Sequence, residues 1–145
     1  MGHTNPKHPF GIDFNKIPPI PDDPAELTKY LSAFKNLLEI EQGKIKRFHR
    51  SGAGGREVVQ AHTSFIDSVI CYIIEKLAAS RKKPSRHTLL EEFSLIAVGG
   101  YGRGELNPCS DIDLLFLTPT NVRRSTNFLI QDFIPILWDL SLIHI

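Results

Sequence analysis

The part of this sequence with the clearest capacity for chemistry is a pair of aspartates separated by one residue. Asp111 and Asp113 begin the stretch Asp111-Ile-Asp-Leu-Leu-Phe-Leu117, which has the composition of a strand. Residues i and i+2 of a strand project from the same face, so the two carboxylates should lie side by side, with Ile112 on the opposite face. Neighbouring carboxylates repel each other unless a cation lies between them, and Mg²⁺ favours one or two carboxylates together with substrate phosphates. The pair therefore predicts a divalent-cation site for a phosphorylated substrate.

Glycines just upstream supply a complementary feature. Gly99 and Gly100 directly follow the apolar run 95–98, and without side chains they let a phosphate approach the backbone N–H groups. Arg103 offers a charge-assisted contact to the same phosphates. Ser110, immediately before the first aspartate, offers a hydroxyl. These four residues are the predicted nucleotide-binding group.

Other glycine motifs fit poorly. The glycines at 99, 100, 102 and 104 do not satisfy GxGxxG, and no GxxxxGK[ST] occurs, which excludes a P-loop. Taken singly, the glycines are explained by a tight turn between strands, and the aspartates by a solvated strand edge. The functional interpretation rests on their combination, with Ser110 ten residues after Gly100.

Apolar periodicity predicts the elements that must position these residues. Three- and four-residue spacing favours helices, and short apolar runs favour strands. The predicted helices cover 24–50, 58–79 and 125–140, and the predicted strands cover 95–98 and 111–117. Asp22 or Asp23 is the expected N-cap, with Pro24 at the first helical position, and Gly43 is a point of possible interruption. His62 lies on the apolar stripe of the second helix, as a core histidine would.

The last predicted helix contains an internal proline. Ile130, Phe133, Ile134 and Leu137 are expected to face inward. Pro135 should kink this helix or remove one of its hydrogen bonds.

The order of elements indicates an α/β (α+β) fold that the chain begins without finishing. We predict a disordered Pro-rich arm over 1–24, a helical lead-in over 25–93, and the first part of a mixed-sheet domain over 94–140. Residues 141–145 stay unassigned. Two strands alone form a marginal sheet, so the sheet is expected to be incomplete.

Composition excludes several classes of protein. The length of 145 residues suits about one domain. Seventeen basic against sixteen acidic residues give a net charge of +1, without the footprint of a nucleic-acid binder. No apolar run approaches the ~20 residues that a bilayer requires. Two cysteines are too few for a disulfide framework, and the N-terminus lacks the apolar region of a secretory signal. A cytoplasmic protein is expected.

The aspartate and glycine segments together resemble a known family. Val98-Gly-Gly-Tyr-Gly-Arg-Gly-Glu-Leu106, Pro108 and Ser110-Asp-Ile-Asp-Leu-Leu115 resemble the bacterial PII uridylyltransferase/uridylyl-removing enzymes of nitrogen regulation. This family belongs to the nucleotidyltransferase superfamily typified by DNA polymerase beta. Ser51-Gly-Ala-Gly-Gly-Arg-Glu-Val-Val59 and the helix after it also resemble the family's N-terminal region. The resemblance covers about residues 25 to 140, and residues 141–145 do not share it.

The resemblance implies transfer of UMP from UTP to a tyrosine hydroxyl of the PII signal protein, with release of pyrophosphate. It implies that Asp111 and Asp113 are the catalytic ligands of Mg²⁺ or Mn²⁺, and that Gly99 and Gly100 contact the triphosphate. Arg103 and Ser110 are carried over as further nucleotide contacts.

The family's HD and ACT domains, and its further carboxylate on a later strand, are expected to lie outside this chain. The remaining aspartates Asp132 and Asp139 are expected to face solvent. The isolated chain is therefore expected to have little or no turnover. Two alternatives stay open: a non-catalytic nucleotide- or partner-binding regulatory module, and a related nucleotidyltransferase acting on another protein, a small molecule or an RNA end.

Overall fold

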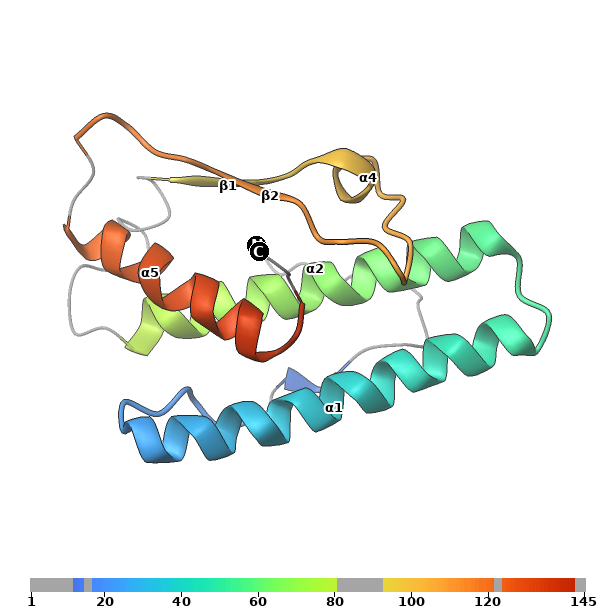
Figure 1. The fold of residues 1–145 in the computed structure, drawn as a ribbon, viewed down its shortest axis with the longest axis horizontal. Coiled ribbons are helices and arrows are strands. Elements are labelled where there is room, and N and C mark those ends of the chain that lie inside the picture. Colours follow the sequence, from blue (N-terminus) through green and yellow to red (C-terminus); the bar gives the residue numbers. More distant parts are fainter. Residues whose placement is uncertain (1–11, 15–16, 81–92, 122–123, 143–145) are drawn as a thin grey trace.

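The chain forms two long helices, a short antiparallel hairpin and a further helix. A computed structural model describes residues 12–14, 17–80, 93–121 and 124–142. The elements in chain order are α1 (Pro24–Arg50), α2 (Gly55–Ser80), β1 (Ser94–Ala97), α4 (Gly99–Gly102), β2 (Leu114–Leu117) and α5 (Arg124–Asp139). Figure 1 shows α1 along one side of α2, and the hairpin with α5 on the other side. The architecture confirms the expected mixed fold with an incomplete sheet.

Helix α1 begins where its sequence predicts. The Asp23 carboxylate accepts a hydrogen bond from the backbone N–H of Ala25 at 2.9 Å, and Pro24 occupies the first helical position. The helix continues through Gly43 to Arg50. Its apolar face, which includes Leu38 and Ile45 on either side of that glycine, is buried. Burial of this face outweighs the roughly 1 kcal/mol that a glycine costs inside a helix.

Helix α2 lies at the centre of the fold and packs against both α1 and α5. The predicted apolar stripe is buried, apart from half-buried Ile74. Its members are Val58, His62, Phe65, Ile66, Val69, Ile70, Ile73 and Leu77. A helix covered on two sides needs a wide apolar face, which explains why adjacent residues such as Phe65 and Ile66 are both buried.

The described end of the Pro-rich arm differs from the disordered segment that we expected. Ile17 and Ile20 are buried in the core, and the Phe14 ring stacks on the Tyr72 ring of α2 with centroids 4.6 Å apart. The Tyr72 hydroxyl also donates to the carbonyl of Pro18 at 3.3 Å. Proline keeps the backbone extended, but the isoleucines between the prolines gain from burial. Residues 1–11 and 15–16 of the arm lie outside the described residues.

Strands β1 and β2 pair antiparallel, with Ser94 opposite Leu117 and Ala97 opposite Leu114. One face of the hairpin packs toward the core, where the Phe116 ring meets the Phe133 ring of α5 edge-on at 5.7 Å. Strand β2 begins at Leu114 rather than at Asp111 as predicted. Its partner β1 ends at Ala97 and the chain turns into α4, so no strand among the described residues lies opposite residues 111 and 112.

Helix α5 runs through Pro135, whose side chain is exposed. Phe133 and Leu137 are buried as predicted, whereas Ile130 and Ile134 are half-buried. The buried stripe is completed instead by Leu129, Ile136 and Leu140. Beyond α5, Leu142 from the unassigned tail is also buried, and residues 143–145 lie outside the described residues. Nothing in the structure tests the predicted domain boundaries, which stay predictions.

None of the helices in the described parts of the chain combines the length and apolar character that crossing a bilayer requires.

Candidate active site

The glycine-rich segment folds as the single helical turn α4, which follows β1 without a linker. The N–H of Gly102 donates to the carbonyl of Val98 at 2.9 Å, and the N–H of Glu105 donates back to the carbonyl of Gly100, also at 2.9 Å. A Cβ atom on Gly102 would lie 2.5 Å from the carbonyl oxygen of Ala97. Such a distance is a steric clash with fixed backbone, so this tight turn requires glycine at position 102.

The Asp113 carboxylate lies directly against this turn. The N–H of Val98 donates to the carbonyl of Asp113 at 3.1 Å, which continues the hairpin ladder one residue beyond Ala97 and Leu114. A Cβ atom on Gly99 would lie 2.9 Å from Oδ2 of Asp113, and Gly99 has φ +61°. Backbone conformation and close approach therefore both favour glycine here. The structure brings one predicted ligand carboxylate and the side-chain-free bend together.

The second carboxylate shares the solvent side with the first. Asp111 and Asp113 are both exposed, and Ile112 between them is buried in the core. The same alternation continues through β2, so the backbone is extended before the strand begins. Although the strand is shorter than predicted, the predicted placement of both carboxylates on one side is retained. Their role as metal ligands stays a prediction.

A turn over residues 107–110 leads the chain into Asp111. The N–H of Cys109 donates to the side-chain oxygen of Asn107 at 3.0 Å, and the N–H of Ser110 donates to the backbone carbonyl of Asn107 at 2.9 Å. An asparagine bonded in this way fixes a tight turn. Ser110 is exposed next to Asp111, as a contact to the same phosphorylated group would require.

Arg103 is the C-cap residue of the glycine turn α4. Its Nε lies 3.5 Å from Oε2 of Glu105, and both side chains are largely exposed. Its Nη2 lies 3.9 Å from the position of a Cβ atom on Gly100. Arg103 also lines a hollow of about 430 Å³ together with Arg56 of α2. The guanidinium thus lies close to Gly100, and its contact with phosphate stays a prediction.

Three polar residues of α2, which the sequence analysis did not assign to the site, hold the glycine turn in place. Thr63 Oγ1 accepts a hydrogen bond from the N–H of Leu106 at 3.0 Å, and the His62 ring lies 3.3 Å from the carbonyl of Leu106 through Nδ1. Asp67 accepts a hydrogen bond from the Tyr101 hydroxyl at 2.6 Å. We call His62, Thr63 and Asp67 the α2 anchor.

The α2 anchor follows from the need to satisfy polar groups that burial removes from water. Leu106 is 1% exposed, so neither of its backbone groups can bond to solvent. The detectable sequence signal was the adjacent polar pair His62 and Thr63 within an apolar stripe. Its partners lie more than forty residues away in sequence, so the sequence alone did not identify them.

Burial shifts the pKa values of two ionisable groups where α2 meets the glycine turn, Tyr101 and His62. It raises the pKa of Tyr101, and the neighbouring Asp67 carboxylate raises that pKa further. Burial also lowers the pKa of His62, against the opposing effect of the Leu106 carbonyl. Tyr101 therefore stays a phenol that donates to Asp67. A carbonyl oxygen only accepts, so the neutral His62 ring donates its Nδ1–H to Leu106.

The chemistry of the exposed pair fits a hard divalent cation. Ionised carboxylates supply only acceptor oxygens, and oxygen ligands are those that Mg²⁺ and Mn²⁺ select. Within the described residues, no group of three or more His, Cys, Asp or Glu side chains converges to hold a metal ion. The described residues thus offer Asp111 and Asp113, with room for further ligands from substrate phosphates. Asp132 and Asp139 on α5 are exposed, as predicted.

Comparisons with known proteins are consistent with this geometry. Residues 74–143 match the family model described as a nucleotidyltransferase domain. Similar curated proteins are bifunctional uridylyltransferase/uridylyl-removing enzymes. The one from Pseudomonas syringae pv. tomato is 31% identical over 77% of this chain, and the one from Phenylobacterium zucineum is 34% identical over 83%. The one from Cereibacter sphaeroides is 36% identical over 60% of the chain. No solved structure matches the chain.

The matched region is a small share of these relatives. It spans 12% of the Pseudomonas syringae protein, 13% of the Phenylobacterium zucineum protein and 9% of the Cereibacter sphaeroides protein.

Proposed function

Because the chain belongs to the nucleotidyltransferase family, with bifunctional uridylyltransferase/uridylyl-removing enzymes among its relatives, we propose that it carries the metal- and triphosphate-binding part of a uridylyltransferase site. The proposed reaction transfers UMP from UTP to a tyrosine hydroxyl of a PII signal protein. The acceptor oxygen forms a bond to the α-phosphorus of UTP, the α–β anhydride bond breaks, and pyrophosphate leaves. The hydroxyl proton is released.

One observation carries the proposal: the Asp113 carboxylate lies against Gly99, with Asp111 exposed on the same side. We propose that these two carboxylates hold Mg²⁺ or Mn²⁺. When bound, such an ion neutralises phosphate charge and polarises the reacting oxygens. The backbone at exposed Gly99 and half-buried Gly100 carries no side chain, and we propose that the triphosphate lies beside it.

Two further residues complete the proposed nucleotide contacts. We propose that Arg103, whose guanidinium lies near Gly100, offsets negative charge on the phosphates. We propose that the exposed Ser110 hydroxyl, adjacent to Asp111, donates a hydrogen bond to the same group. We also propose a cytoplasmic location, which suits a protein that uses a nucleoside triphosphate.

A binding test separates this site from an ordinary acidic surface. We expect the full 145-residue chain to bind UTP in the presence of Mg²⁺ and to lose that binding in EDTA, as measured by titration calorimetry. Asp113→Asn and Asp111→Asn should each weaken UTP binding by about 10–100-fold or more. This is the loss typical of disturbed metal sites. Asp139→Asn, which removes an exposed carboxylate from α5, is the matched control. Equal loss in all three variants, or UTP binding independent of metal, would refute the proposal.

A regulatory module that binds UTP without chemistry is the second candidate, because no group of three or more His, Cys, Asp or Glu side chains converges within the described residues. Incubation of the chain with UTP, Mg²⁺ and a PII protein distinguishes the two, with mass spectrometry reporting any addition of UMP. We expect little transfer by this chain alone, and robust modification would overturn that expectation. Other acceptors, whether a different protein, a small molecule or an RNA end, are tested in the same assay.

A further inference from the structure

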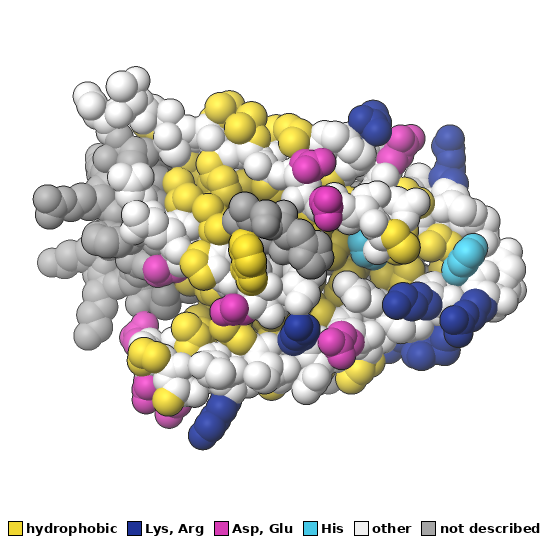
Figure 2. Space-filling view, in the orientation of Figure 1, with side chains coloured by type: hydrophobic (Ala, Val, Ile, Leu, Met, Phe, Trp, Pro, Cys, Tyr) yellow, Lys and Arg dark blue, Asp and Glu magenta, His cyan; other side chains and the backbone are white. Residues whose placement is uncertain are grey.

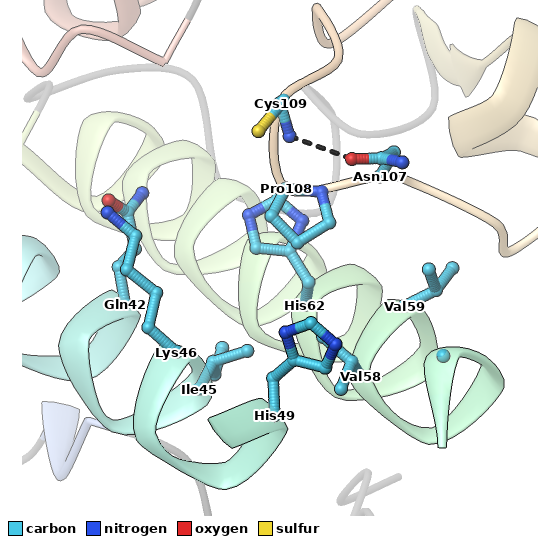
Figure 3. Close-up of a pocket in the computed structure, with 11 residues that line it drawn as sticks. Gln42, Ile45, Lys46, His49, Val58, Val59, His62, Asn107, Pro108 and Cys109 are labelled. Carbon is cyan, nitrogen blue, oxygen red and sulfur yellow. Dashed lines mark hydrogen bonds between the residues drawn. The ribbon is translucent and has the colours of Figure 1, made fainter. Parts of the chain in front are cut away.

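A cavity of about 370 Å³ lies where the end of α1, the start of α2 and the turn over 107–109 meet. Figure 3 shows its walls, with the turn on one side and the two helices on the other. Its volume falls within the range of about 300–1,000 Å³ that is usual for small-molecule sites. Gly99, Gly100, Asp111 and Asp113 do not line it, so it is distinct from the carboxylate site. The lining residues are Gln42, Ile45, Lys46, His49, Gly55, Val58, Val59, His62, Asn107, Pro108 and Cys109.

The cavity combines apolar walls with a few polar groups. Ile45, Val58, Val59 and Pro108 supply apolar surface from three separate segments. His62 adds a ring whose Nδ1–H is engaged by the carbonyl of Leu106. The neutral ring therefore keeps Nε2 as a hydrogen-bond acceptor. These walls suit a compact apolar body.

Lys46 supplies a positive charge at this cavity, and no acidic side chain among the lining residues offsets it. Lys46 and His49, three residues apart on α1, both line it and both are exposed, and no Asp or Glu is among the lining residues. The surrounding sequence from 42 to 56 contains five Lys and Arg residues and no acidic residue. Figure 2 shows dark blue side chains gathered at the end of the molecule where α1 meets α2. A ligand here gains from a negative charge.

The N-terminal end of α2 contributes little attraction for an anion at this cavity. Glu57 already lies at that end of the helix, and its carboxylate accepts a hydrogen bond from the N–H of Gly54 at 2.9 Å. The attraction for an anion therefore comes from the Lys46 side chain, and the His49 ring adds a hydrogen-bonding group.

We propose that this cavity is a second binding site, for a small organic anion with a carboxylate or phosphate group on a compact apolar body. The anionic group lies between Lys46 and His49, and the apolar body lies against Val58, Val59 and Pro108. This assignment does not depend on the proposed uridylyltransferase function, because it concerns different residues and needs neither UTP nor metal.

The experiment uses the full chain, with phenyl phosphate and benzoate as probes and NMR of the histidine rings as readout. Phenyl phosphate and benzoate share an apolar ring and differ in the anionic group, so they separate the two ligand sources. We expect at least one of them to shift the His62 ring signals saturably, in EDTA and without UTP. Phenol and inorganic phosphate, which each lack one half of the proposed ligand, should bind at least tenfold more weakly.

Substitutions of exposed side chains by uncharged glutamine test the proposed contacts without disturbing the core. Lys46→Gln combined with His49→Gln should weaken the better probe about tenfold or more, since it removes charge-assisted hydrogen bonds. Lys29→Gln, at the exposed opposite end of α1, should leave the affinity unchanged. Absence of a saturable shift, equal affinity in the double variant, or equal binding of inorganic phosphate would overturn the proposal. Displacement of the probe by UTP with Mg²⁺ would also overturn it, because the cavity would then be part of the nucleotide site.

Discussion

The α2 anchor gives the most direct test of how the helical region supports the glycine turn. Thr63 is buried, and its Oγ1 is the acceptor for the buried N–H of Leu106 at 3.0 Å. Thr63→Val replaces this oxygen by a methyl group of similar size. The Thr63 hydroxyl also donates to the carbonyl of Val59 at 2.9 Å. That carbonyl still accepts the α-helical hydrogen bond from residue 63. The substitution therefore leaves one buried donor, the Leu106 N–H, without an acceptor, and it opens no cavity.

The expected cost is the penalty of an unsatisfied buried donor, about 1–3 kcal/mol in the free energy of unfolding. With a urea m-value of about 1–3 kcal/mol/M for a small protein, the unfolding midpoint should fall by about 1 M. Thr63→Ser keeps the hydroxyl but removes a buried methyl, so it should cost about 0.8 kcal/mol. It should leave the Leu106 hydrogen bond in place.

Urea unfolding followed by circular dichroism measures the stability, and amide hydrogen exchange measures the Leu106 N–H itself. Exchange at Leu106 should accelerate strongly in Thr63→Val and stay close to wild type in Thr63→Ser. Thr28→Val is the matched control, because the exposed Thr28 also donates to the carbonyl four residues earlier but accepts no tertiary hydrogen bond from the part of the chain that the structure describes. This control should change stability by less than about 0.5 kcal/mol. The reasoning is refuted if Thr63→Val costs no more than Thr28→Val and Leu106 exchange is unchanged.

Three further predictions concern the same junction. Gly102→Ala should lower the free energy of unfolding by about 1–3 kcal/mol, measured by urea unfolding, because its Cβ would meet the Ala97 carbonyl at 2.5 Å. The control Gly55→Ala has open space around its Cβ and should be neutral or stabilising. Equal effects of the two substitutions would contradict the predicted clash. Burial lowers the pKa of His62 below 6.5 in the folded state, so the unfolded state binds the proton more readily and stability should fall as the pH drops below about 6.5. Urea midpoints at pH 7.5 and 5.5 should show this decrease in wild type and a smaller one in His62→Gln; identical slopes would rule His62 out as the cause. Tyr101→Phe removes a hydrogen bond of 2.6 Å and should cost about 0.5–1.5 kcal/mol, measured by thermal unfolding, and no loss would argue against that bond in solution.

Local sequence predicted the elements that depend on local physics. The start of α1 follows from Asp23 and Pro24, whose capping and backbone preferences act within one helical turn. The stripe on α2 follows from its periodicity, and the break after α1 follows from the glycines between 51 and 55. Helix α2 begins at Gly55, three residues before the predicted start at Val58. The proximity of Asp113 to Gly99 was expected from the order strand, glycine turn, strand, and the structure places them in contact.

Other features depend on partners distant in sequence, and the prediction missed or misplaced them. The length of β2 was overestimated because it depends on where its partner β1 ends, at Ala97. Burial of Ile17 and Ile20 within the Pro-rich arm depends on the surface that α1 and α2 offer them. The inward face of α5 was rotated in the prediction, since Ile130 and Ile134 have the same apolar character as Leu129 and Ile136.

The sequence by itself determined which chemical groups this protein presents: two acidic side chains, a bend free of side chains, and helices with apolar stripes. Only the tertiary structure decided what holds that bend in position, because the Leu106 backbone finds its partners on α2 after the chain has folded. The physical reason is that the spacing of apolar residues predicts which face of a helix is buried. It does not predict which residues distant in sequence will contact that face. Hydrogen-bond partners are chosen by geometry, and that geometry exists only once the helices and the hairpin have packed together.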